Sequence, residues 1–431
     1  MGRRSKIPKV GGGAETYPQP FVSDPKLEDP DQTGIIGGSH GRDRSVYIAA
    51  FRRDWSSSKP YYPLYKQTSA SGESSSPPAA GKKKARRVAK LRTDVGGKTF
   101  VSIQSRWIAG VGGDPGGTII YDTATGMVIH GPHLVAAKRC PIVAAVGFRV
   151  FALCSRPSYI DDPNFVPWFE VLDLKDAIIT EAEDGSLSLD GCSWKELPSP
   201  LCFPAKLTPM ITVRSNVVVG RYILVSLNPP SSGTFAFDTE EDEWHKVDKE
   251  HLPFVGPATP HGSIFLALSR DNGPICAYRI CVVSASISSS SSSVSAEAKV
   301  SHHKGGALKL SVTVFSVRGK DRGEVDAISG GYLTSLDSEH FSTLTFELDN
   351  RKRSRIFDDT ISDFRPGKLF AKLMTYQIEN PEILEEQALN DEEKTRAVMP
   401  GLSISSQWEQ IFKISSDFGF SSPPIIFALS I

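Results

Sequence analysis

The sequence predicts an all-β fold built from repeated units of four strands, and three observations lead to this prediction. Short apolar runs separated by Gly, Pro and polar turn residues continue from residue 99 nearly to the C-terminus. A strand that closes on an apolar or aromatic residue followed by Asp recurs at Asp122, Asp173 and Asp238, at intervals suited to four-stranded units with loops. The hydrophobic content of 39 %, with 22 Phe, predicts a globular body with a sizeable core rather than a wholly disordered chain.

Residues 1–95 form the first predicted region, which we expect to be mostly disordered and basic. The chain has no net charge, yet residues 1–94 hold 18 of its 49 basic residues and only 9 of its 49 acidic ones. Ser, Pro and Lys dominate residues 56–92, which predicts a linker or an insertion. One possible strand lies at residues 45–51. The ordered, net acidic body is expected to span residues 96–431.

The predicted units share one order of strands. An apolar strand is followed by a second strand ending in aromatic-Asp, then by a polar turn and a strand that opens with Trp. In the clearest unit, we expect Asp238 to accept backbone N–H bonds within its turn and Trp244 to pack beside Phe237 of the same hairpin. Asp173 and Trp194 repeat this pair on either side of an insertion. These aspartates and tryptophans are predicted to be structural repeat residues.

The rest of the chain supplies further strands and two interruptions. The further strands are expected at residues 262–268, 275–283, 308–317, 331–336, 341–349 and 408–414. Residues 284–306 form a Ser-rich insertion that predicts a flexible loop, and an Asn-Pro pair predicts a short helix near residues 381–394. A last strand at 424–431 is expected to pair with residues 45–51 and so close a ring of about five to seven units.

At these residues the chain resembles the kelch-repeat β-propeller family, as a divergent member similar to poorly characterised plant kelch-like proteins. The matching features are the strands ending at Asp122, Asp173 and Asp238 and the Trp-led strands at Trp194 and Trp244, over residues 99–350. The family's Gly-Gly doublet is present at residues 112–113 and 330–331. The resemblance implies a propeller of four-stranded blades whose loops bind a protein partner. It implies a fold more directly than an activity.

Two glycine-rich patterns lack the setting that their chemistry needs. Residues 37–41 match the GxSxG pattern of a hydrolase nucleophile elbow, but Arg-Asp-Arg follows where that motif requires a helix. Residues 96–99, Gly-Gly-Lys-Thr, look like the end of a phosphate-binding P-loop, but Arg92 occupies the place of the first Gly and a strand is expected to follow. We therefore expect neither a nucleophilic serine nor a nucleotide phosphate at these positions.

No cofactor and no metal site are expected. His130 and His133 are separated by Gly and Pro, which preclude a shared helical face, and no Cys or carboxylate is adjacent to complete a zinc shell. The pair at residues 302–303 lies beside the Ser-rich insertion. The acidic runs at 240–243 and 382–386 are typical of solvated turns and helix faces. No catalytic residue is predicted.

A basic segment at residues 82–92 is the remaining candidate site. Its first five basic residues are predicted to form a nuclear-import segment: Lys82, Lys83, Lys84, Arg86 and Arg87. The alternatives are a solvated linker and a phosphate contact with nucleic acid. No aromatic residue lies within the cluster to stack on bases, so nucleic acid is not an expected partner.

The sequence also favours a cytoplasmic or nuclear, monomeric protein. No apolar run long enough to cross a bilayer is present, and the N-terminus does not resemble a secretory signal. The six cysteines lack paired spacing and lie partly in apolar runs, which is typical of reduced, buried thiols.

Two functions remain open at this point. The leading one is a non-catalytic protein-interaction module that presents propeller loops to a protein partner. The alternative is an enzyme whose active site lies in the central channel, where residues from several units converge without a linear motif. A cluster of titratable side chains in one deep axial pocket would favour the enzyme.

Overall fold

The computed structural model describes residues 19–21, 45–53, 59–68, 85–157, 166–201, 203, 211–228, 233–270, 275–284, 308–319, 332–349, 368–383, 398–415 and 426–430. Within these residues the regular structure is almost entirely β-strand, which confirms the all-β prediction. Glu382 and Ile383 alone have helical backbone there. The rest of the predicted helix, from residue 384, and the Ser-rich insertion from residue 285 to 306 lie outside the described residues.

The described strands group into six antiparallel units of four strands each, ordered from the centre outward. The first three units are β6(Lys98–Ile103), β7(Trp107–Gly113), β8(Gly116–Asp122) and β9(Val128–Gly131); β10(Ile142–Val146), β11(Arg149–Leu153), β12(Phe169–Asp173) and β15(Trp194–Glu196); and β16(Thr212–Val219), β17(Tyr222–Asn228), β18(Thr234–Asp238) and β19(Glu243–Asp248). The next two are β20(Phe254–His261), β21(Ile264–Ser269), β22(Ile275–Ser284) and β23(Leu308–Gly319); and β24(Tyr332–Ser335), β25(His340–Asp349), β26(Lys368–Ile378) and β27(Val398–Ser415). The sixth is β28(Ile426–Ser430), β2(Ser45–Ala50), β4(Pro60–Thr68) and β5(Arg86–Arg92).

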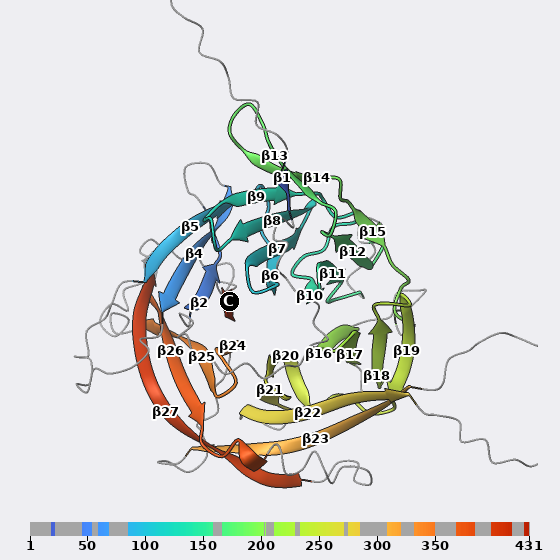
Figure 1. Ribbon diagram of the computed structural model, residues 1–431, viewed down its shortest axis with the longest axis vertical. Coiled ribbons are helices and arrows are strands. Elements are labelled where there is room, and N and C mark those ends of the chain that lie inside the picture. The colour runs from blue at the N-terminus through green and yellow to red at the C-terminus, as the bar shows by residue number, and fades with distance from the viewer. Residues whose placement is uncertain are drawn as a thin grey trace, which may run out of the picture.

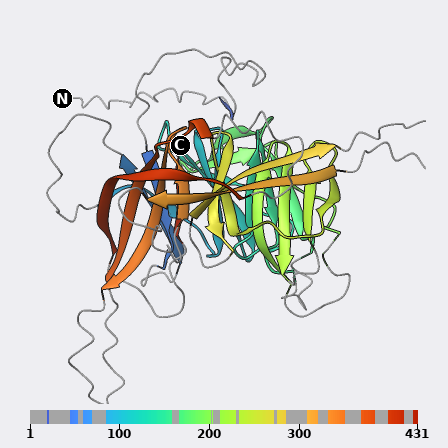
Figure 2. The same ribbon diagram turned by 90° about the horizontal axis from the view of Figure 1, so that it is seen from below.

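The units stand around a common centre, with the first strand of each unit innermost (Figure 1). Seen from the edge, the strands cross the thickness of a flattened body (Figure 2). Neighbouring units also share hydrogen bonds, because the inner strands β16 and β20 pair in parallel and so do the outer strands β23 and β27. Clusters of buried apolar side chains fill the contact between each unit and its two neighbours, so the hydrophobic core is divided among these contacts.

The sixth unit combines three strands from the N-terminal part of the chain with the C-terminal strand β28. β28 is antiparallel to β2, with Val46 opposite Ser430 and Ala50 opposite Ile426. The predicted pairing of residues 424–431 with the strand near residues 45–51 is thus confirmed. All six residues of β2 are buried, which explains why its sequence is so apolar: both of its faces and both of its edges are covered.

The prediction of a linker at residues 56–92 is wrong at β4 and β5. Tyr62, Leu64 and Leu91 are buried there, in the contact between the sixth and first units. The sequence did not predict β5 as a strand because it is an outer strand on which Arg86, Arg87 and Arg92 are exposed. An edge strand rich in basic residues has the composition of a solvated linker.

Two short hairpin strands, β13(Ile178–Glu181) and β14(Leu187–Asp190), fill the insertion between Asp173 and Trp194. The two-residue strand β1(Gln19–Pro20) pairs with β13, and the next residue, Phe21, is buried against Trp107 with ring centroids 4.5 Å apart. A piece of the predicted disordered arm is therefore part of the core between the first and second units. β3(Arg52–Arg53) pairs with β4 in the same region of the sequence.

The repeat aspartates have the predicted role in their turns. Asp122 accepts backbone N–H bonds from Ala124 and Thr125 at 2.9 and 3.4 Å, and Asp238 accepts those of Glu240 and Glu241 at 3.0 and 3.4 Å. Asp173 accepts one such bond, from Lys175 at 2.9 Å. Asp122 and Asp238 are also ion-paired with an arginine that precedes the neighbouring strand, Arg106 and Arg221 respectively.

The repeat tryptophans connect neighbouring units. Trp244 is buried, its ring centroid 5.1 Å from that of Phe237, and its Nε1 donates to the carbonyl of Pro198, which follows the second unit. Trp194 donates from Nε1 to Thr118 Oγ1 of the first unit at 2.9 Å. The predicted packing of Trp244 beside Phe237 is confirmed, and the indole N–H bonds to the preceding unit were not foreseen.

A buried ion pair makes a further connection between the first and second units. Lys138, in the segment that follows β9, is bonded to Glu170 of β12, and neither side chain is exposed. Glu170 also accepts the backbone N–H groups of Val135 and Ala136, at 2.7 and 3.1 Å. The charge of each partner is therefore balanced within the core.

Candidate functional site

A cleft of about 600 Å³ opens where the outer strands of the sixth unit diverge from those of the first. Its walls come from the start of β4, the end of β5, the segment 93–95 that leads into β6, and the adjoining ends of β6, β8 and β9. Deeper in the same contact the two units meet through the apolar side chains of Tyr62, Leu91, Phe100 and Ile119. The cleft is thus a polar opening at one end of the otherwise apolar contact between the sixth and first units.

The lining of this cleft, which we call the basic cleft, carries an excess of positive charge. It contains two histidines, four Lys or Arg side chains and a single carboxylate: His130, His133, Lys59, Lys90, Arg92, Lys98 and Asp94. Lys59 and Asp94 form an exposed ion pair at 2.9 Å. Lys90 lies over the ring of Tyr61, with its Nζ 4.1 Å from the ring centroid. Arg92 and Lys98 add further positive charge to the lining.

Lys98 lies at the floor of the basic cleft and is 1 % exposed. Its Nζ donates to the carbonyls of Gly112 and Gly117, at 2.9 and 2.6 Å. Burial lowers the pKa of Lys98 to about 8, because desolvation disfavours the ammonium form. Within the described part of the chain, no carboxylate is bonded to this ammonium group.

Glycine shapes the floor around Lys98. Gly112 has a φ of +122°, and a Cβ there would lie 2.7 Å from the carbonyl oxygen of Gly97, so only glycine fits. At Gly117 a Cβ would lie 3.6 Å from both Lys98 Nζ and His133 Cε1. A Cβ at this position would therefore be in van der Waals contact with both the lysine and the imidazole.

His133 is held in one orientation by the same turn. Its Nδ1 lies 2.8 Å from the carbonyl oxygen of Gly116, and a carbonyl can only accept, so Nδ1 carries a hydrogen. In the neutral ring Nε2 is then an acceptor, and in the protonated ring it is a second donor.

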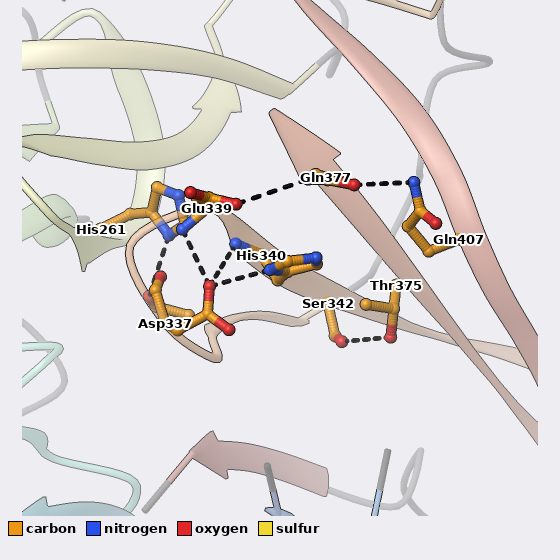
Figure 3. Close-up of polar contacts among 9 residues, drawn as sticks. His261, Asp337, Glu339, His340, Ser342, Thr375, Gln377 and Gln407 are labelled. Atoms are coloured by element: carbon orange, nitrogen blue, oxygen red, sulfur yellow. Dashed lines mark hydrogen bonds and ion pairs between the residues drawn. The ribbon is translucent and has the colours of Figure 1, made fainter. Parts of the chain in front are cut away.

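A second polar cluster lies beside the centre of the molecule, where the inner strands β20 and β24 end. It contains His261, Asp337 and His340 (Figure 3) together with Ser335. His261 Nδ1 is 2.9 Å from Ser335 Oγ, and His340 Nδ1 is 2.9 Å from Asp337 Oδ1. Asp337 Oδ1 also accepts the backbone N–H of His340 at 2.8 Å. This is the same turn device that Asp122 and Asp238 use.

Burial limits what the central cluster can do chemically. His261 is 2 % exposed, and its Nε2 has no hydrogen-bond partner in the described part of the chain. Burial lowers the pKa of His261, the Asp337 carboxylate opposes this effect, and the positive charge of His340 adds to it. From this turn, polar contacts continue outward from Glu339 through Gln377 to Gln407, across β26 and β27 (Figure 3).

The structure divides the predicted basic segment into parts with different surroundings. Lys82, Lys83 and Lys84 lie outside the described residues. Arg86 and Arg87 are exposed on β5 and do not line the basic cleft, whereas Lys90 and Arg92 of the same strand do. Of the five predicted import residues, the described part of the chain thus includes Arg86 and Arg87.

Sequence reasoning singled out some residues of the basic cleft without bringing them together. His130 and His133 were considered for metal, and Lys98 for a P-loop, but all three line one cleft with Lys59 and Tyr61. The Gly-Gly-Asp-Pro-Gly-Gly run at residues 112–117 was the available signal, since repeated glycine marks close backbone approach. Among the described residues, no group of three or more His, Cys, Asp or Glu is arranged to hold a metal ion.

Comparison with known proteins gives one family match. The family model described as "Protein of unknown function (DUF1668)" matches residues 43–399, most of the chain. The chain belongs to the DUF1668 family. The match begins just before β2 and ends within β27, so the walls of the basic cleft and the central cluster of this DUF1668 chain both lie inside it. No curated protein matches the chain.

The described part of the DUF1668 chain contains no helix with the length and apolar character that a bilayer crossing requires.

Proposed function

We propose that the chain is a kelch-like β-propeller of six blades, closed by the pairing of β28 with β2. The support is the set of six four-stranded units around one centre, together with the Asp turns and Trp-led outer strands of the second and third units. Pairing the first strands of a propeller with its last removes the open edges that would otherwise invite aggregation.

The proposed function is that of a non-catalytic protein-interaction module whose basic cleft receives an acidic segment of a partner protein. The observation that carries it is the lining of the cleft, where four cationic side chains and two histidines accompany one carboxylate that is already paired. A complementary negative segment would gain both affinity and a faster association rate. The net acidic body elsewhere would repel that segment and direct it to the cleft.

Affinity capture with paired variants tests this function. Arg92 is replaced by Glu in one protein, and in the control Arg87, exposed on the same strand but outside the cleft, is replaced by Glu. We expect the wild type and Arg87→Glu to retain the same acidic partners in crosslinking mass spectrometry, with crosslinks to Lys59 or Lys90. Arg92→Glu should lose them. Equal capture by the two variants, or crosslinks confined to other surfaces, would contradict the proposal.

The second candidate is an enzyme with its active site at the centre of the ring. The hydrogen bond between His261 and Ser335 favours it, because a serine bonded to an imidazole is the core of a nucleophile and base pair. The second bond of the serine weighs against it, since Ser335 Oγ donates its hydrogen to the carbonyl of Asp337 at 3.3 Å and so does not direct it to His261. Labelling of the whole protein with a fluorophosphonate probe, compared with Ser335→Ala, decides the point, and labelling that requires Ser335 would favour the enzyme.

We also propose a cytoplasmic or nuclear location, with residues 82–87 serving as the import segment. The support is the run of five basic residues, Lys82, Lys83, Lys84, Arg86 and Arg87, of which the last two are exposed.

A further inference from the structure

The charge of the basic cleft exceeds what a single carboxylate can balance. Lys59 and Asp94 form an ion pair, and Lys98 and Arg92 add two further positive charges to the lining. A glutamate or aspartate side chain carries one negative charge, whereas a phosphate monoester carries between about 1.5 and 2 at pH 7 and has three acceptor oxygens. The monoester matches the remaining cations more closely.

The floor of the cleft supplies a buried donor suited to an anion. The Lys98 ammonium has three N–H donors, and its two bonds to Gly112 and Gly117 use two of them. A buried ammonium that is bonded to neutral carbonyls and to no carboxylate is costly to keep charged. An anion that reaches the floor would supply the missing counter-charge and an acceptor for the third N–H. Burial already lowers the pKa of Lys98 to about 8, although the charge of Asp94 opposes this effect.

The other donors fit the same group. Arg92 is exposed at the end of β5, and a guanidinium presents a planar fork that matches two phosphate oxygens at once. His133 has its Nδ1 hydrogen fixed on Gly116, so protonation adds a donor at Nε2. Gly117 lies beside both this imidazole and Lys98, since a Cβ there would be 3.6 Å from each.

We propose that the basic cleft recognises a phosphorylated side chain within the acidic partner segment, with Lys98 at the floor and Arg92 at the mouth as the principal donors. This inference rests on the proposed function. A bound dianion stabilises the ammonium form of Lys98, so binding raises the pKa of Lys98. Near pH 8 the complex therefore takes up a fraction of a proton from solution. Affinity should then fall as pH rises above 8, because the free cleft loses its floor charge.

The test uses the full chain and three degenerate nonapeptide pools that differ only at the central residue: phosphoserine, glutamate or serine. Binding is measured by fluorescence anisotropy at fixed salt, at pH 7.0 and pH 9.0, for the wild type, Arg92→Gln and the matched control Arg87→Gln. We expect the phosphoserine pool to bind the wild type about tenfold or more tightly than the glutamate pool. Arg92→Gln should remove most of that preference, Arg87→Gln should keep it, and the preference should shrink at pH 9.0.

The outcomes separate this inference from the function on which it rests. Equal binding of the phosphoserine and glutamate pools, both weakened by Arg92→Gln, would overturn phosphate recognition and leave the acidic-segment module standing. Binding of free O-phosphoserine as tight as that of its pool would keep the phosphate site but overturn the peptide partner. Equal binding by Arg92→Gln and Arg87→Gln, or no binding of any pool, would overturn both.

Discussion

Trp244 shows how one side chain stabilises two units at once. Its ring is 7 % exposed and packs on Phe237 of its own hairpin and on Phe169 of the preceding unit, with centroids 5.1 and 5.4 Å away. Its Nε1 donates to Pro198 at 2.9 Å. Apolar burial accounts for most of this stabilisation, and the hydrogen bond fixes the orientation of the ring.

Replacing Trp244 separates these two contributions. Trp244→Ala should lower the free energy of unfolding by roughly 3–5 kcal/mol, because a large aromatic leaves a cavity between two units. Trp244→Phe keeps an aromatic ring in place but loses the bond to Pro198, and should cost about 1–3 kcal/mol. Urea denaturation followed by tryptophan fluorescence and circular dichroism measures both. A Trp244→Ala protein with an unchanged midpoint would show that the contact contributes nothing.

His261 should make the stability of the protein depend on pH. Burial lowers its pKa in the folded state, so below about pH 6.5 the unfolded chain binds a proton that the folded protein resists. This part of the stability is complete above pH 6.5 and is lost as pH falls through and below that value, by at most about 1.4 kcal/mol per pH unit. Burial lowers the pKa of His251 as well, and its contribution has the same sign.

Denaturation midpoints at pH 7.5 and 5.5 test this prediction. We expect the wild type to lose stability between the two values and His261→Gln to lose less, while the difference between the two proteins is constant above pH 7. A His261→Gln protein that loses as much stability as the wild type on acidification would show that His261 does not titrate in this manner.

Among the elements, β4 and β5 best show the limits of sequence reasoning. The strands of the body were predictable because aromatic-Asp turns and apolar runs depend only on residues that are close together in the sequence of one unit. β5 reads Arg-Arg-Val-Ala-Lys-Leu-Arg, and only its contact with the first unit reveals that Leu91 is buried. Its partner β4 is separated from it by Ser and Gly. Pairing between distant segments leaves no local pattern to read.

The basic cleft was unpredictable for the same reason. Lys59 and Lys90 come from one unit and Lys98 and His133 from another, so the site exists only when the first and sixth units pack together. The sequence did indicate the glycines of residues 112–117, but the carbonyls of Gly112 and Gly117 that bond Lys98 depend on the folded backbone. The central cluster is similar, since His261 and Ser335 are 74 residues apart.

The strand β28 gives a prediction at the same scale. Deletion of residues 426–431 removes the inner partner of β2 and opens the contact around Ile48 and Phe412. We expect a thermal midpoint lower by about 5–10 °C and a tendency to aggregate through the uncovered edge of β2. Deletion of residue 431 alone is the matched control and should leave the midpoint unchanged. Calorimetry and light scattering measure both effects, and an equally stable six-residue deletion would contradict the proposed closure.

For the whole molecule, charge distribution sets the expected partners. Residues 95–431 hold 31 of the 49 basic residues and 40 of the 49 acidic residues. A body of this sign repels the phosphates of a duplex. The basic residues 82–87 are therefore expected to act in import and not in nucleic-acid binding.

A salt titration of binding to generic duplex DNA checks this expectation. We expect weak binding by the wild type and no change when Lys82, Lys83, Lys84, Arg86 and Arg87 are replaced by Ala, while microscopy of the same variant shows a reduced nuclear fraction. If these five residues contacted phosphates, the logarithm of the binding constant would fall with that of salt with a slope of about −4.5. Tight binding with such a slope, abolished in the variant, would make nucleic acid the first partner to consider.

The pairing of β2 with β28 also means that the fold cannot be completed until translation reaches the last strand. β2 leaves the ribosome early, but its inner partner begins at Ile426, 376 residues after β2 ends at Ala50. At about 5–20 residues per second, β2 waits roughly 20–75 s for the strand that covers it. During this time the five units of the body have emerged in turn, while β2 carries an uncovered apolar edge. The nascent chain is thus most exposed to aggregation at β2, and chaperone binding during translation should concentrate there.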